Sequence, residues 1–248
     1  MFDLNMAMWA IAIAAAFCIG FSKTGLPSMG ILVVTIFSQL FPTKASVGIL
    51  LPMLIVGDLF AVTYYRRSVV WKYLYTLIPW VLTGIIAGYF VLKFIENEQL
   101  QILLGLLILI LIVFHFFRNT FENRLSADYA KSAWFSLVMG FLAGFATMVG
   151  NAAGGIMSVY LLSKGLPKKE FVGTGAWFYL AVNVIKVPFN VHLGLITWET
   201  LKFNGMLVPA IVGGALLGRY ILPKIPEKWF QYIVLILAMI GAIRLILF

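Results

Sequence analysis

Long apolar segments separated by short polar loops are the feature of this sequence that most limits its fold. Ten such segments follow one another along the chain. They span residues 5–22, 28–41, 46–64, 73–95, 99–117, 132–149, 152–163, 171–187, 204–223 and 228–247. Several are about 20 residues long, the length that a helix needs to cross the ~30 Å hydrocarbon core of a bilayer. The sequence therefore predicts an all-α polytopic membrane protein whose helices are surrounded by lipid.

The composition excludes most soluble enzymes. Of the 248 residues, 62% are hydrophobic and 11% are charged, whereas a soluble protein carries about 25% charged residues. One cysteine (Cys18) and two histidines leave almost no ligands for a metal site and no partner for an intrachain disulfide. No cofactor, metal or catalytic residue set is expected, and the basic residues lie at the ends of apolar segments rather than in a nucleic-acid-binding patch.

The distribution of lysine and arginine predicts the orientation in the membrane. If every segment crosses the bilayer and the N-terminus is outside, 13 of the 18 basic residues lie on the inner side. Cytoplasmic loops carry such an excess of positive charge. We therefore expect a multi-pass protein of the cell inner membrane with both termini on the outer, periplasmic side. The N-terminal segment lacks the basic region of a signal peptide, which indicates that it is retained.

The two halves of the chain resemble each other. Pro42, Lys44 and Gly48 recur as Pro167, Lys169 and Gly173, all 125 positions later, and Asp58 falls opposite Asn183. The sequence predicts a first membrane repeat (1–117), a cytoplasmic linker (118–131) and a second repeat (132–248). Five segments per repeat is an odd number, so the second repeat is expected to be inverted, as in many secondary transporters. The second segment of each repeat is shorter than an ordinary membrane-spanning helix. The sequence does not decide whether it crosses the membrane fully or enters and returns on one side.

A glycine-rich break precedes each short segment, at 20–30 and 144–155. A glycine-rich turn that leads into a helix offers unpaired N–H groups and the positive end of the helix dipole to an anion. The alternative is that these glycines only allow close helix packing and that Lys23 only marks the inner side. We favour a binding site. The predicted substrate-binding residues are Ser22, Lys23, Thr24, Gly25, Ser28, Thr147, Gly150, Asn151 and Ala152.

Asp58 is the one acid that lies well inside an apolar segment. An intramembrane carboxylate is costly and is therefore a functional hypothesis by default. Asp58, with Asn183 opposite, is assigned a coupling or gating role: it would carry a coupling proton or neutralise Lys23 in the empty site. A purely structural hydrogen-bond acceptor is the alternative. Lys186 lies near the outer end of its segment and is predicted to snorkel to the membrane surface.

The paired breaks and the repeated Pro-x4-Gly-x3-Gly pattern (Pro79, Gly84, Gly88 and Pro209, Gly214, Gly218) carry a resemblance to a known family. With the proline before a basic residue at each third segment and the tryptophan turns at Trp71 and Trp198, the chain resembles the TauE/SafE sulfite-exporter family over nearly its whole length. The resemblance implies secondary transport of small anions such as sulfite, thiosulfate or sulfoacetate. The family's glycine-rich signature falls on 20–30, where Ser22, Lys23 and Thr24 replace small residues.

The sequence thus predicts a secondary transporter of sulfur oxyanions or organosulfonates, working by alternating access at a midplane site, with a proton as candidate coupling ion. A passive anion channel is the alternative, since the same anion cradle would serve it. An enzyme is disfavoured because no carboxylate pair, His/Cys cluster or nucleophile–base set lies within the apolar segments. The oligomeric state is left open.

Overall fold

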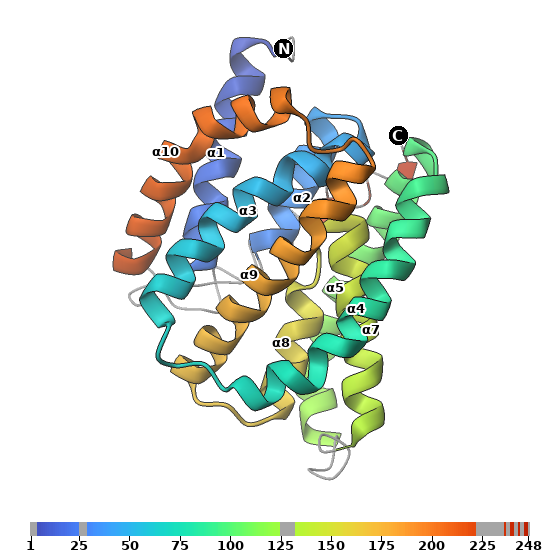
Figure 1. Cartoon of the computed structure of the whole chain (residues 1–248), viewed down its shortest axis with the longest axis vertical. Helices are drawn as coiled ribbons and strands as arrows, with labels where there is room; N and C mark the ends of the chain where they lie inside the picture. The colour runs from blue at the N-terminus through green and yellow to red at the C-terminus, as the bar shows by residue number, and fades with distance from the viewer. Residues whose placement is uncertain are drawn as a thin grey trace.

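The structure, a computed structural model, is all-helical in the part of the chain that it describes. The described residues are 4–24, 29–124 and 132–221, with six single positions between 236 and 247. The helices are α1 (Met6–Lys23), α2 (Met29–Leu40), α3 (Thr43–Tyr65), α4 (Trp71–Phe94), α5 (Asn97–Arg124), α7 (Ala133–Gly150), α8 (Gly154–Ser163), α9 (Lys168–His192) and α10 (Trp198–Ile221) (Figure 1). Each of the first nine predicted segments coincides with one of these helices. The tenth lies outside the described residues, apart from the single positions.

Several helix starts are set by the residue just before them. The side chains of Asn5 and Ser132 accept hydrogen bonds from the backbone N–H groups of Met8 and Trp134, at the starts of α1 and α7. Such caps satisfy N–H groups that have no partner within the helix. α3 and α9 both begin directly after a proline in an extended conformation.

Among the described residues, six helices are long and apolar enough to cross a membrane: α1, α3, α4, α7, α9 and α10. The chain is therefore a multi-pass membrane protein. α2 has 12 residues and α8 has 10, which at ~1.5 Å per residue gives helices of only about 18 and 15 Å. The prediction of a short helix as the second element of each half is confirmed.

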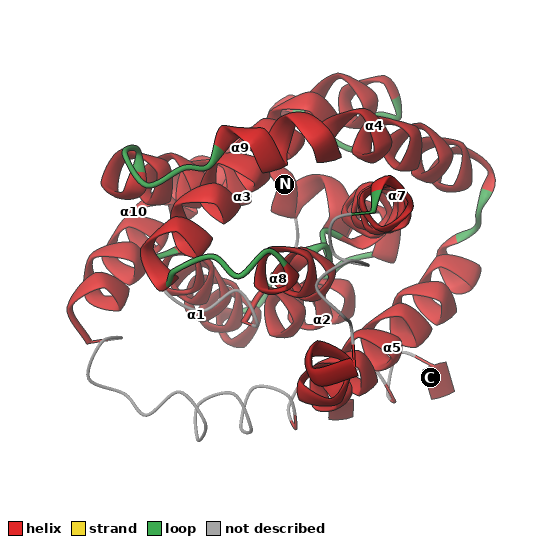
Figure 2. Ribbon diagram, turned by 90° about the horizontal axis from the view of Figure 1, so that it is seen from below, coloured by secondary structure: helices red, strands yellow, loops and turns green. Residues whose placement is uncertain are grey.

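The most extensive helix–helix interfaces join the two halves of the chain. α4 packs along α7, α1 packs along α10, and α3 packs on α9. Figure 1 shows α1 and α10 on one side of the molecule, α4 and α7 on the other, and α3 and α9 between them. Seen from below, α2 and α8 lie in the interior between the two outer pairs (Figure 2).

Glycines allow the outer pairs to approach this closely. A Cβ atom on Gly84 of α4 would overlap the carbonyl oxygen of Phe141 on α7, and one on Gly144 would overlap that of Val81. The α1–α10 pair has the same arrangement, with Gly20 and Gly214 against carbonyl oxygens of the facing helix. Gly84 and Gly214 thus let the helices of each outer pair pack closely.

Candidate functional site

The second predicted break is an abrupt helix end. α7 stops at Gly150, and Asn151 adopts a left-handed backbone conformation (φ 53°) that turns the chain toward α8. Asparagine tolerates this conformation better than most residues. The Asn151 side chain fixes the turn by donating from Nδ2 to the carbonyl oxygen of Val47 on α3, at 3.0 Å. In the first break, Lys23 is the last residue of α1, and residues 25–28 lie outside the described part of the chain.

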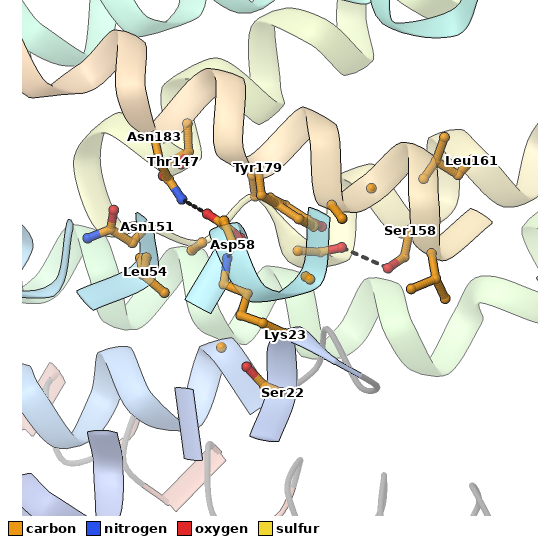
Figure 3. Close-up of a pocket in the computed structure, with 18 of the residues that line it drawn as sticks. Ser22, Lys23, Leu54, Asp58, Thr147, Asn151, Ser158, Leu161, Tyr179 and Asn183 are labelled. Atoms are coloured by element: carbon orange, nitrogen blue, oxygen red, sulfur yellow. Dashed lines mark hydrogen bonds and ion pairs between the residues drawn. The ribbon is translucent and has the colours of Figure 1, made fainter. Parts of the chain in front are cut away.

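The two breaks meet at a cavity of about 70 Å³ lined by residues of α1, α2, α3, α7, α8 and α9 and of the turn before α8. A cavity must offer the centre of a water molecule about 10–15 Å³ in order to hold one water. The space here therefore suits a small anion or a few waters. The walls are largely apolar. Its polar side chains are Ser22, Lys23, Asp58, Thr147, Asn151, Ser158, Tyr179 and Asn183 (Figure 3).

An ion pair forms one wall of the cavity. The Lys23 ammonium lies 2.6 Å from Oδ1 of Asp58, whose side chain is fully buried. On the other side of the carboxylate, Asn183 donates from Nδ2 to Oδ2 at 2.6 Å, and Figure 3 shows Asp58 between these two partners. The Lys23 ammonium also lies 4.7 Å from the centre of the Tyr179 ring, within the range of a cation–π contact.

The start of α8 forms another wall. Ala152, Ala153 and Gly154 line the cavity, and their small side chains let a ligand come close to the backbone. The first turn of a helix leaves N–H groups without partners in the helix, and its dipole favours negative charge. The cavity therefore has a cation on one side and a helix N-terminus on another, an arrangement suited to an anion.

Lys186 does not snorkel to the membrane surface as the sequence analysis predicted, and that prediction is wrong. Its side chain is 1% exposed. The ammonium donates to the Thr147 carbonyl oxygen at 2.8 Å, to Thr147 Oγ1 at 2.9 Å and to Asn151 Oδ1 at 2.6 Å. These hydrogen bonds hold the Lys186 side chain inside the protein. It therefore lies behind Thr147 and Asn151, two residues of the cavity wall.

Seven of the predicted site residues line the cavity. They are Ser22, Lys23, Asp58, Thr147, Asn151, Ala152 and Asn183. Thr24 instead faces α10, where its hydroxyl donates to the carbonyl oxygen of Ala215 at 3.2 Å. Gly150 faces α5, because a Cβ there would overlap the side chain of Leu104. Gly25 and Ser28 lie outside the described residues.

The sequence analysis missed three polar residues of the site: Ser158 and Tyr179 in the wall, and Lys186 behind it. Tyr179, Asn183, Lys186 and Asn190 are spaced by four, three and four residues, which places them on one face of α9. This polar stripe on α9 is the signal that would have found Tyr179 and Lys186, whereas Ser158 lies in α8 and has no such signal. In the described residues, no group of three or more His, Cys, Asp or Glu side chains could hold a metal ion.

Comparison with known proteins gives one match. The family model for the sulfite exporter TauE/SafE matches residues 12–245, nearly the whole chain. No curated protein and no solved structure was found to match. The match spans both breaks and every helix that contributes to the cavity. The chain therefore belongs to the sulfite exporter TauE/SafE family, whose members are membrane transporters.

Proposed function

We propose that this TauE/SafE family member is a secondary transporter of small anions and that the cavity beside Lys23 is its substrate site. Sulfite, thiosulfate and sulfonates such as sulfoacetate are the proposed substrates. One observation carries the proposal: the Lys23 ammonium lines a small cavity at the end of α1, where its only acidic partner in the described residues is Asp58. A substrate oxyanion would exchange with that carboxylate.

In the proposed mechanism, Asp58 neutralises Lys23 while the site is empty. An entering oxyanion then takes the place of Asp58 at the ammonium, and the N–H groups at the N-terminus of α8 replace part of its hydration shell. The released carboxylate keeps its hydrogen bond from Asn183 or takes up a proton. A proton is therefore the proposed coupling ion.

We also propose that residues 1–117 and 132–248 are inverted repeats, which would allow the site to open alternately to either side. The helix pairing supports this. The first helix of each half packs on the fourth helix of the other (α1 on α10, and α7 on α4), and the third helices, α3 and α9, pack on each other. Such reciprocal pairing is what a two-fold axis between the halves would produce.

Uptake into proteoliposomes tests the role of Lys23. The Lys23→Ala variant should take up labelled sulfite or thiosulfate at least about tenfold more slowly, because the loss of a charged contact worth roughly 1.4 kcal/mol or more changes binding by that factor. Lys202→Ala is the matched control, since Lys202 is an exposed lysine near the start of α10. Unchanged uptake by Lys23→Ala would remove this lysine from the site.

The same preparation separates a transporter from the channel alternative. If the protein is a transporter, proteoliposomes preloaded with unlabelled anion should take up labelled anion faster, by counterflow. If it is a channel, the flux should show only electrodiffusion. Counterflow in the wild-type protein, lost in Lys23→Ala, would favour alternating access at this cavity. Flux without counterflow would favour the channel.

A further inference from the structure

The nitrogen of Lys186 lies within hydrogen-bond distance of three oxygens, as many acceptors as a charged ammonium can donate to. All three oxygens are neutral and lie at the end of α7. An ammonium has three N–H donors and no acceptor, so the three contacts satisfy it fully. The Asn151 oxygen is held in the accepting orientation because the amide nitrogen of that side chain donates to Val47.

No carboxylate touches Lys186 within the described residues. Asp58, the one buried acid there, already pairs with Lys23 at 2.6 Å. Lys186 lies within electrostatic range of both Lys23 and Asp58. With all three groups ionised, two positive charges and one negative charge lie in or behind the cavity wall, which leaves one positive charge without a counter-ion in the membrane interior.

We propose that Lys186 sets the charge of the anion that the cavity accepts: it supplies the one positive charge that a bound monoanion neutralises. An uncompensated charge in a membrane is costly, so binding of one negative charge relieves that cost. The ammonium acts through the wall formed by Thr147 and Asn151 and is a specificity-determining residue that does not touch the substrate. This inference rests on the proposed function of the cavity.

The charge balance also predicts how a dianion is accommodated. Asp58 contacts Lys23 of α1 and Asn183 of α9, and Tyr179 and Lys186 of α9 lie within electrostatic range of its carboxylate. If a proton binds to the Asp58 carboxylate, the cluster carries two positive charges and matches a dianion. A monoanion with ionised Asp58 and a dianion with one proton are therefore the two neutral occupied states.

A set of charge variants tests this inference with two probes, methanesulfonate as monoanion and sulfoacetate as dianion, whose charges are fixed near neutral pH. Lys186→Gln keeps an amide donor toward α7 and removes the charge, and Lys186→Met removes both. Asp58→Asn raises the net charge by one. Lys202→Met is the control, because it removes an equal charge from an exposed position. Affinity is measured by isothermal titration of the purified full chain in nanodiscs.

Coulomb energy scales with the product of the charges, so the two probes should respond differently. In the Asp58→Asn background, where binding exchanges no proton at residue 58, Lys186→Gln should weaken binding of methanesulfonate by about tenfold and binding of sulfoacetate by about the square of that factor, roughly a hundredfold. Asp58→Asn should shift the preference toward sulfoacetate by about tenfold or more. Lys202→Met should change neither affinity, since solvent screens an exposed charge.

Equal weakening of binding of both probes by Lys186→Gln and Lys186→Met in the Asp58→Asn background would overturn the inference, because lost packing or a lost hydrogen bond acts on both anions alike. Unchanged affinities would overturn it as well. If Lys186→Met does not fold, the glutamine variant and Asp58→Asn still decide the outcome. A wild-type protein that binds neither these sulfonates nor sulfite and thiosulfate would instead overturn the proposed function of the cavity.

Discussion

At the scale of single residues, Lys23 and Asp58 need each other when the cavity is empty. A buried charge without a partner costs several kcal/mol, and the 2.6 Å ion pair removes that cost for both groups. The hydrogen bond from Asn183 satisfies the second carboxylate oxygen. In the proposed mechanism, a substrate therefore competes with Asp58 for Lys23.

The proposed proton coupling depends on the carboxylate of Asp58, because an amide cannot bind a proton in its place. In the Asp58→Asn variant, we expect uptake of labelled thiosulfate to respond less than twofold to an imposed pH gradient. The wild-type protein should respond severalfold. Glu199→Gln is the control, since Glu199 is exposed in the first turn of α10. Wild-type uptake that ignores the gradient would end the coupling role of Asp58.

Sequence patterns identified some residues of the site but not others. Asp58 stood out as an acid inside an apolar segment, and Asn183 followed from the 125-residue offset between the halves. Lys186 was misplaced because its position near one end of a segment fits snorkelling as well as burial. Lys186 is buried because hydrogen-bond acceptors of Thr147 and Asn151, at the end of α7, bind its ammonium. The hydropathy of the segment that contains Lys186 cannot reveal acceptors on another helix.

At the scale of helices, sequence located every described element but not all of its ends. α9 begins at Lys168, before the apolar run that starts at 171, and α10 begins at Trp198, before the run at 204. α5 continues to Arg124, into the predicted linker at 118–131. Hydropathy indicates which residues lie in lipid, whereas a helix continues through polar residues as long as its backbone hydrogen bonds can form.

The close approach of α4 and α7 makes the size of residue 84 critical. Gly84→Ala should reduce the free energy of unfolding by about 1–3 kcal/mol, because the new methyl group would overlap the Phe141 carbonyl oxygen and push the helices apart. Thermal or denaturant unfolding of the purified protein in detergent measures the change. Gly205→Ala is the control, since Gly205 lies in α10 with open space at its Cβ position; alanine there should be neutral or stabilising. Equal effects of the two substitutions would contradict this account of the interface.

At the scale of the whole molecule, the cavity lies among elements that belong to both halves of the chain. Its lining comes from α1, α2 and α3 of the first half and from α7, α8 and α9 of the second. A relative movement of the halves would therefore change the cavity walls on both sides at once. The glycine contacts of α1 with α10 and of α4 with α7 suit these outer pairs to move as rigid units around the site.

The excess of basic residues on one side predicts the orientation of the molecule in the membrane, with both termini outside. With both termini outside, the loop between α3 and α4 faces the cytoplasm, and the loop between α4 and α5 faces the periplasm. In a Cys18→Ser background, which removes the single native cysteine, we introduce one cysteine per variant. Arg67→Cys and Glu96→Cys are suitable because both side chains are exposed in these loops.

A membrane-impermeant thiol reagent is applied to spheroplasts, in which the outer membrane is open and the inner membrane is intact. It should label Glu96→Cys and leave Arg67→Cys unlabelled. After permeabilisation of the inner membrane, both variants should react, which controls for local reactivity. The Cys18→Ser protein without an added cysteine gives the background. The reverse pattern would place the termini in the cytoplasm and would contradict the orientation that the charge distribution predicts.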